Sequence, residues 1–238
     1  MILFHGTSNR EVIPQFGLGN EKHDYGKGFY LTDNLDLAKE WAVYRPDESN
    51  GWVHKYMPNM DGLRVLDFQN ENILSWLAEL MKHRDAADSK RYRMLAKKFI
   101  DKYGIPTEDY DVIKGYRADA SYFYIAKAFV RDEVDVDILE ELLSLGGLGI
   151  QYCIKSQKAF DNLIEIIYII FDYPYKQYKK IVKKTYIIFT EIKEDIIPVQ
   201  FSEYNEKYNE RDIAAREKMK RLIDSDRNQV TKVFSTLF

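Results

Sequence analysis

Short apolar runs alternate along this chain with longer segments in which apolar residues recur at helical spacing. The strand-like runs cover residues 2–4, 29–32, 110–114 and 150–154. Helical spacing begins after a capping residue, Asp33 or Asn34, and recurs around residues 73–81, 88–104, 122–126, 138–145 and 159–163. This pattern predicts a mixed α and β fold with short strands and helices of medium length.

Alternation within two of these strands places core residues on one face and candidate functional residues on the other. Phe29 and Leu31 share one face of their strand and are the natural core residues, while Tyr30 points to the opposite face. In the late strand, Gln151 and Cys153 share a face. The lone cysteine has no activating base nearby in the sequence, so we expect a buried, unreactive thiol.

A turn-rich segment follows the first predicted helix. The sequence Pro-Asn-Met-Asp-Gly at residues 58–62 separates the apolar runs 53–57 and 63–68. Two strand-like runs joined by such a short turn predict a β-hairpin.

Composition limits the function classes only broadly. The chain has 238 residues, 45% of them hydrophobic and 14% aromatic, which is typical of a folded domain. A net charge of −3 provides no overall field that would attract nucleic acid or membrane. The single cysteine fits a reducing compartment, and neither a signal peptide nor a membrane-length apolar stretch is evident. We therefore expect a cytoplasmic protein without a membrane partner.

Residues 172–238 differ in character from residues 1–171. Five lysines cluster at 176–184, and the charged region beyond 203 carries apolar positions at helical spacing. We expect a first domain over 1–171 and a charged, largely helical extension over 172–238 that could pack on it. A solvated helix face is the usual meaning of such a lysine run.

Two motifs in the first 32 residues are the strongest chemical signals. Phe4-His5-Gly6-Thr7-Ser8 ends the first predicted strand, and Tyr25-Gly26-Lys27-Gly28-Phe29-Tyr30-Leu31-Thr32 leads into the second. Each places a hydrogen-bonding or aromatic side chain beside glycines, which allow a ligand to approach the backbone closely. Neither matches a phosphate-binding loop or a Rossmann fingerprint, because the glycines precede a strand rather than open a helix.

These motifs resemble the first two signatures of the ADP-ribosyltransferases, in the subclass marked by His, Tyr and an acidic residue. The chain is most similar to a little-characterised bacterial group with a His-Gly-Ser/Thr start and a Gly-Lys-Gly-Phe-Tyr-Leu-Thr motif. Ala118-Asp119 matches the end of that group's middle segment, and the resemblance covers roughly residues 2–163. It implies an α+β fold with a split, mainly antiparallel sheet around an NAD cleft, flanked by helices.

The resemblance also implies roles for the residues of the first motif. His5 would hydrogen-bond a ribose hydroxyl of NAD, and Gly6 would offer its backbone groups to the nicotinamide amide. Thr7 would also lie at the NAD site, although it could simply cap the strand. The alternative for His5 is an ordinary histidine hydrogen-bonded within the fold.

Further positions carry over in the same way from the second motif and the middle segment. Tyr30 would stack on nicotinamide, although it could instead be a core tyrosine with its hydroxyl satisfied. Lys27 would reach an NAD phosphate beside Gly28, although an exposed loop lysine is the ordinary alternative. Asp119 would orient His5 or a substrate group, or would cap a helix.

The third signature departs from the acidic pattern. Gln151 stands where the acidic members have a glutamate, and an amide can hydrogen-bond the ribose but carries no charge. Three explanations are open: an acceptor that supplies its own nucleophile, a displaced carboxylate from Asp119, Glu140 or Glu141, or NAD binding without catalysis.

The leading hypothesis is an NAD-dependent mono-ADP-ribosyltransferase in which His5, Tyr30 and Gln151 act on NAD as co-substrate. The acceptor would be an unidentified protein or nucleic acid, and by association the protein would be a toxin or effector with a neutralising partner protein. The alternative is a non-catalytic module that binds NAD or ADP-ribose, or a protein-interaction module. RNA 2′-phosphotransfer and simple NAD hydrolysis stay open. The histidines have no metal-ligand spacing, so no metal is expected.

Overall fold

The structure is a computed structural model, and its described residues include twelve helices and strands. It describes residues 1–43, 50–84, 89–118, 120–131, 133–135, 138–139, 141–142, 149–170, 196–202, 213–214, 217–218 and 220–222. The elements are β1 (Leu3–Thr7), β2 (Phe29–Thr32), α1 (Leu35–Val43), β3 (Gly51–Tyr56), β4 (Val65–Asp67), α2 (Ile73–His83), α3 (Lys90–Tyr103), β5 (Val112–Tyr116), α4 (Ala120–Val130), β6 (Ile150–Ile154), α6 (Gln157–Ile170) and β7 (Ile196–Val199).

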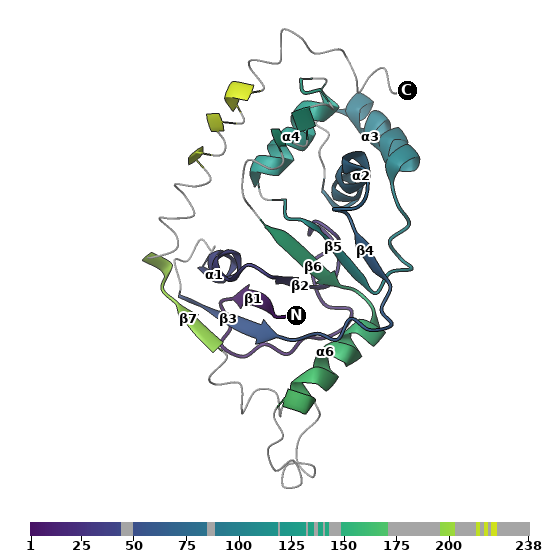
Figure 1. Cartoon of the computed structure of the whole chain (residues 1–238). Coiled ribbons are helices and arrows are strands. Elements are labelled where there is room, and N and C mark those ends of the chain that lie inside the picture. The colour runs from purple at the N-terminus through teal and green to yellow at the C-terminus, as the bar shows by residue number, and fades with distance from the viewer. Residues whose placement is uncertain are drawn as a thin grey trace.

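Seven strands form one sheet in the order β4-β5-β6-β2-β1-β3-β7 (Figure 1). Within this sheet β4 and β5 run parallel, and the other neighbouring strands pair antiparallel. The structure thus confirms the predicted α+β class and the mainly antiparallel sheet. The strands of the two motifs, β1 and β2, lie side by side near the middle of the sheet.

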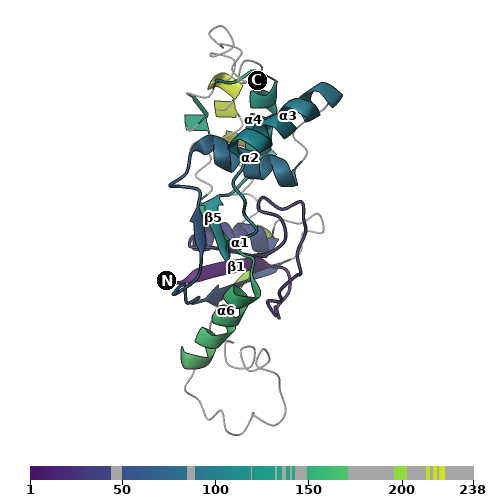
Figure 2. The ribbon, with the colours of Figure 1, turned by 90° about the vertical axis from the view of Figure 1, so that its right-hand side faces the viewer.

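Helices cover both faces of the sheet. On one face, Phe160 and Leu163 of α6 pack on Leu3 of β1 and Leu31 of β2. On the other face, α1 covers the β1–β3–β7 end, and α2, α3 and α4 cover the β4–β5–β6 end. Figure 2 shows α2–α4 gathered at one end of the molecule and α6 at the other. No helix among the described residues is long and apolar enough to cross a membrane.

Local signals explain where several helices begin and end. The side chain of Asn34 accepts a hydrogen bond from Leu37 N at 3.1 Å, so Asn34 caps α1 as one of the two predicted candidates. The third helix ends at Gly104, whose N–H donates to the oxygen of Ile100 at 2.8 Å. The predicted helix start and the predicted glycine stop are both confirmed.

The predicted hairpin over 53–68 is wrong. A turn does form, with Leu63 N donating to Met60 O at 3.1 Å, but the two strands beside it do not pair. Strand β3 lies between β1 and β7, whereas β4 lies at the opposite edge of the sheet beside β5. Val53 packs against α1 while Leu66 packs with the α2–α4 helices, so the apolar side chains of the two runs belong to different cores.

The last described strand comes from the segment that the sequence assigns to the charged extension. Strand β7 pairs with β3, with Val199 opposite Gly51, and completes the sheet on that edge. Val199 is buried against α1, so this part of the extension packs on the first domain. The lysine cluster at 176–184 lies outside the described residues.

Candidate functional site

The two sequence motifs meet where the pairing of β1 and β2 stops. The ladder between these strands has one residue pair, Phe4 opposite Thr32, whereas β1 pairs with β3 along its whole length. Beyond that pair, a side chain of β1 binds the backbone of β2: Nδ1 of His5 donates to the backbone oxygen of Tyr30 at 2.8 Å. We call His5, Gly6 and the Tyr30 carbonyl the β1–β2 junction.

The geometry of the ladder fixes the direction of the Gly6 peptide groups. Because Tyr30 O accepts from His5, it points toward β1, and so do the backbone groups of Thr32 two residues later. The backbone N–H and C=O of Phe4, which pairs with Thr32, therefore face β2. Gly6, two residues after Phe4, directs its own N–H and C=O to the same side, into the junction.

His5 is held in its neutral form. Burial lowers its pKa to about 4, against the smaller opposing effect of the hydrogen bond to Tyr30. Since Nδ1 donates to Tyr30, Nε2 carries the lone pair and can accept a hydrogen bond. The ring also packs on Phe29 with a centroid separation of 4.4 Å. His5 can therefore act as a fixed acceptor at physiological pH.

Gly6 and Thr7 also have packing roles. A Cβ atom on Gly6 would lie 1.8 Å from the backbone oxygen of Ala38, so helix α1 can approach β1 only because position 6 is glycine. The buried hydroxyl of Thr7 accepts a hydrogen bond from Asn9 N at 3.2 Å and shapes the turn after the strand. The glycine serves both the close packing of α1 and the exposure of its peptide groups at the junction.

Tyr30 anchors the loop that precedes its own strand. Its hydroxyl donates to Gly26 O at 2.7 Å and accepts from Tyr25 N at 3.0 Å. The ring stands edge-to-face to His23, with centroids 5.2 Å apart, on the sheet face opposite Phe29. The hydroxyl is thus satisfied within the fold, and it locks the ring and the loop together.

The glycine-flanked lysine of the second motif lies on the surface of the same loop. Lys27 pairs with Glu21 at 2.9 Å, and both side chains are largely exposed. A Cβ atom on Gly28 would lie 2.3 Å from the sulfur of Cys153, so this glycine permits close packing on β6. The cysteine is buried, and burial raises the pKa of its thiol to about 12.

Gln151 is buried on β6 and hydrogen-bonded to an aspartate from the β1–β2 loop. Its Nε2 donates to Asp24 Oδ2 at 2.7 Å and to Tyr116 O at 3.2 Å. Asp24 is 4% exposed and also lies 2.6 Å from Nη2 of Arg84. A carboxylate thus lies within hydrogen-bond distance of the position where the resemblance expects a glutamate.

A family model described as a protein of unknown function, DUF3990, matches residues 1–164 of the chain. The chain belongs to this family. No curated protein and no solved structure matches it. The DUF3990 match contains the β1–β2 junction and the Asp24–Gln151 pair, and it ends within α6, before β7.

Some of the predicted site residues of this DUF3990 chain come together and others do not. His5 and Gly6 meet Tyr30 at the junction, and Gln151 shares a sheet face with Tyr30 because it pairs with Thr32 on β2. Asp119 and Glu140 lie outside the described residues, and Glu141 is exposed. Within the described part of the chain, no group of three or more His, Cys, Asp or Glu could hold a metal ion.

No sequence pattern identified Asp24 as a site residue. It lies in a polar, glycine-rich loop, where an aspartate is ordinarily solvated or supports a turn. Its burial follows from its neighbour Tyr25, which is fully buried and donates its hydroxyl hydrogen to Tyr116 O at 2.6 Å. A large aromatic residue within such a loop was the signal available, and it indicates that the loop folds inward.

Proposed function

We propose that this DUF3990 protein is an NAD-dependent mono-ADP-ribosyltransferase. In this reaction the bond between nicotinamide and ribose C1′ breaks, and nicotinamide leaves as a neutral molecule with the bonding electron pair. C1′ then bonds to a nucleophilic atom of the acceptor, which releases a proton. The observation that most supports the proposal is the β1–β2 junction, where a neutral histidine interrupts a ladder and the peptide groups of a glycine point into the interruption.

The junction suits the ribose and carboxamide of nicotinamide riboside. His5 Nε2 would accept a hydrogen bond from a ribose hydroxyl, because Nδ1 is already committed to Tyr30. The N–H and C=O of Gly6 match the acceptor and donor of a carboxamide. The Tyr30 ring, held by its hydroxyl, would provide a stacking surface that cannot turn away. Lys27, exposed on the loop beside Gly28, would provide a cation for a phosphate of NAD.

A second function is favoured by Gln151 itself. Its amide is neutral, and the amide nitrogen is committed to Asp24 and Tyr116. A site that binds NAD or ADP-ribose without breaking the glycosidic bond needs no charge at this position. The second candidate is therefore a non-catalytic module that binds NAD or ADP-ribose.

The test is to incubate the full chain with NAD and a cell lysate and to follow nicotinamide release and the mass of every ADP-ribosylated product. We expect release with an adduct on protein or nucleic acid, reduced at least about 100-fold in His5→Ala. His54→Ala is the matched control, because His54 stands directly opposite His5 on β3, on the side of β1 away from β2. Saturable NAD binding without release would support the non-catalytic module, and neither binding nor release would overturn both functions.

A further inference from the structure

The carboxylate of Asp24 is surrounded by donors. Oδ2 accepts hydrogen bonds from Ala118 N at 2.8 Å and Gln151 Nε2 at 2.7 Å. Oδ1 faces the guanidinium of Arg84, whose Nη2 lies 2.6 Å away. Burial raises the pKa of Asp24 above its ordinary value. Arg84, the Ala118 N–H and the Gln151 amide act in the opposite direction, because they stabilise the ionised, acceptor-only form.

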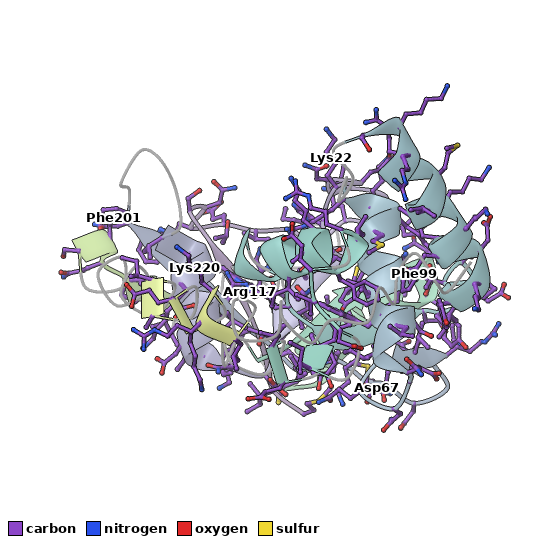
Figure 3. All side chains as sticks on the ribbon, turned by 90° about the horizontal axis from the view of Figure 1, so that it is seen from above. Lys22, Asp67, Phe99, Arg117, Phe201 and Lys220 are labelled. Carbon is purple, nitrogen blue, oxygen red and sulfur yellow. The ribbon has the colours of Figure 1, made fainter. Side chains whose placement is uncertain are left out.

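This charge is buried beside a second ion pair. Arg117 follows β5 directly and lies 3.6 Å from Glu40 of α1, and its guanidinium stacks over the ring of Trp41. Arg117 is 7% exposed, and Figure 3 labels it near the middle of the molecule seen from above. Both Arg117 and Asp24 are more than nine-tenths buried. Burying charges costs free energy even when they are paired, so stability alone is a weak reason for an aspartate at this place.

Asp24 also fixes the orientation of the Gln151 amide. Both groups that Nε2 touches, Asp24 Oδ2 and Tyr116 O, are acceptors, so the NH₂ end must face them. The amide oxygen makes neither bond. A carboxylate that accepts from one end of an amide increases the negative charge on the oxygen at the other end. Gln151 thereby becomes a stronger and better-oriented acceptor than a solvated glutamine.

We propose that Asp24 is a positioning residue that, through Gln151, supplies the negative charge needed beside the ribose as nicotinamide leaves. This inference rests on the proposed function. As the glycosidic bond breaks, positive charge develops on C1′ and the ring oxygen of ribose, and a fixed negative charge nearby stabilises that transition state. In this protein the carboxylate comes from the β1–β2 loop and not from the late strand, which carries the amide.

The experiment moves the carboxylate between the two positions. Nicotinamide release from NAD is measured in the wild type, in Asp24→Asn and in the double variant Asp24→Asn/Gln151→Glu. Removing the charge should lower kcat about 100-fold or more while changing KM much less, since the charge acts mainly in the transition state. The double variant, with the carboxylate on β6, should recover kcat to within about tenfold of the wild type.

The matched control is Asp67→Asn. Asp67 on β4 is likewise an aspartate in an ion pair, with Lys114 at 2.7 Å, although it is partly and not fully buried, and Figure 3 shows it well away from Arg117. It should retain wild-type kcat. An Asp24→Asn variant within threefold of wild-type kcat overturns the inference but leaves the proposed function standing. A folded, NAD-binding double variant that stays as slow as Asp24→Asn also overturns it, and a wild type that releases no nicotinamide overturns both.

A milder change provides a second test if Asp24→Asn does not fold. Arg84→Gln removes the cation beside Asp24 and should raise the pKa of that carboxyl, so the acid limb of the kcat–pH profile moves to higher pH. The titratable and charged groups around Asp24 are His23, Tyr25, Tyr30, Arg84, Arg117 and Cys153. His23 is also influenced by Arg84, so both profiles are recorded in a His23→Gln background. An unmoved acid limb overturns the inference.

Discussion

At the scale of single residues, the β1–β2 junction depends on one histidine in one protonation state. Nδ1 of His5 donates to Tyr30 O, and the ring is largely removed from water. Protonation would place a charge in this site, which burial disfavours, so the folded protein retains the neutral ring well below the ordinary pKa of histidine. Because its pKa is lowered on folding, His5 should make a measurable contribution to the pH dependence of the unfolding free energy.

Stability should therefore depend on pH through His5. Because the pKa is about 4 in the folded chain and 6.5 ordinarily, the unfolded chain binds the proton first as the pH falls. The contribution is complete above pH 6.5 and is lost progressively as the pH falls toward about 4. Between about pH 7.5 and pH 5 the wild type should lose about 2 kcal/mol more unfolding free energy than His5→Gln, which does not titrate. Urea unfolding at both pH values measures this difference, and equal losses would show that His5 titrates normally.

At the scale of elements, the loop before β2 is held by side chains that the sequence scatters widely. Tyr30 binds the backbone of Tyr25 and Gly26, and Lys155, the residue after β6, donates to Tyr25 O at 3.1 Å. Trp76 of α2 donates its indole N–H to the Tyr25 hydroxyl at 3.0 Å. The loop is thus attached to the sheet and to α2, which is why Asp24 has a fixed position.

Removing the Tyr30 hydroxyl should loosen this loop without removing the ring. Tyr30→Phe leaves Tyr25 N and Gly26 O without their partner, which should cost about 1–2 kcal/mol of unfolding free energy. Hydrogen exchange should become faster in the peptide covering 20–28. Tyr56→Phe is the control, because burial is the cause that raises the pKa of the Tyr56 hydroxyl. Unchanged exchange in Tyr30→Phe would contradict the anchoring role.

The local sequence predicts most of the helices and strands, but it does not predict which strands pair with each other. The capped start of α1, the glycine stop of α3 and the alternation in β2 and β6 involve residues only a few positions apart. The hairpin prediction failed for the complementary reason: a turn sequence fixes a turn, whereas the choice of neighbouring strands depends on which core buries each apolar side. Strand β5 begins two residues later than its apolar run, at Val112, so boundaries were less accurate than element types.

At the scale of the whole molecule, one sheet connects the site to the last described strand. The DUF3990 match ends at residue 164, yet β7 at 196–199 pairs with β3 and packs under α1. Helix α1 in turn lies directly on Gly6 of the junction. The segment beyond the family match therefore supports the packing of the site from the neighbouring edge.

A substitution in β7 should destabilise the entire chain. Val199 is 2% exposed, and Val199→Ala should lower the unfolding free energy by about 2 kcal/mol in a single cooperative transition. Val65→Ala is the matched control on the opposite edge strand, where the valine is 38% exposed and the cost should be within about 0.5 kcal/mol. Equal effects of the two substitutions would show that β7 is not part of the folded core.

The sequence by itself determined the mixed fold class, most helices and strands, and the two motifs that meet at the β1–β2 junction. These depend on short-range periodicity, capping and the permissiveness of glycine, which are properties of neighbouring residues. Only the tertiary structure decided that β3 and β4 separate, that His5 is neutral, and that Asp24 contacts Gln151 across 127 positions of sequence. Burial and long-range pairing set these features, because desolvation and hydrogen bonding act between groups that only the folded chain brings together.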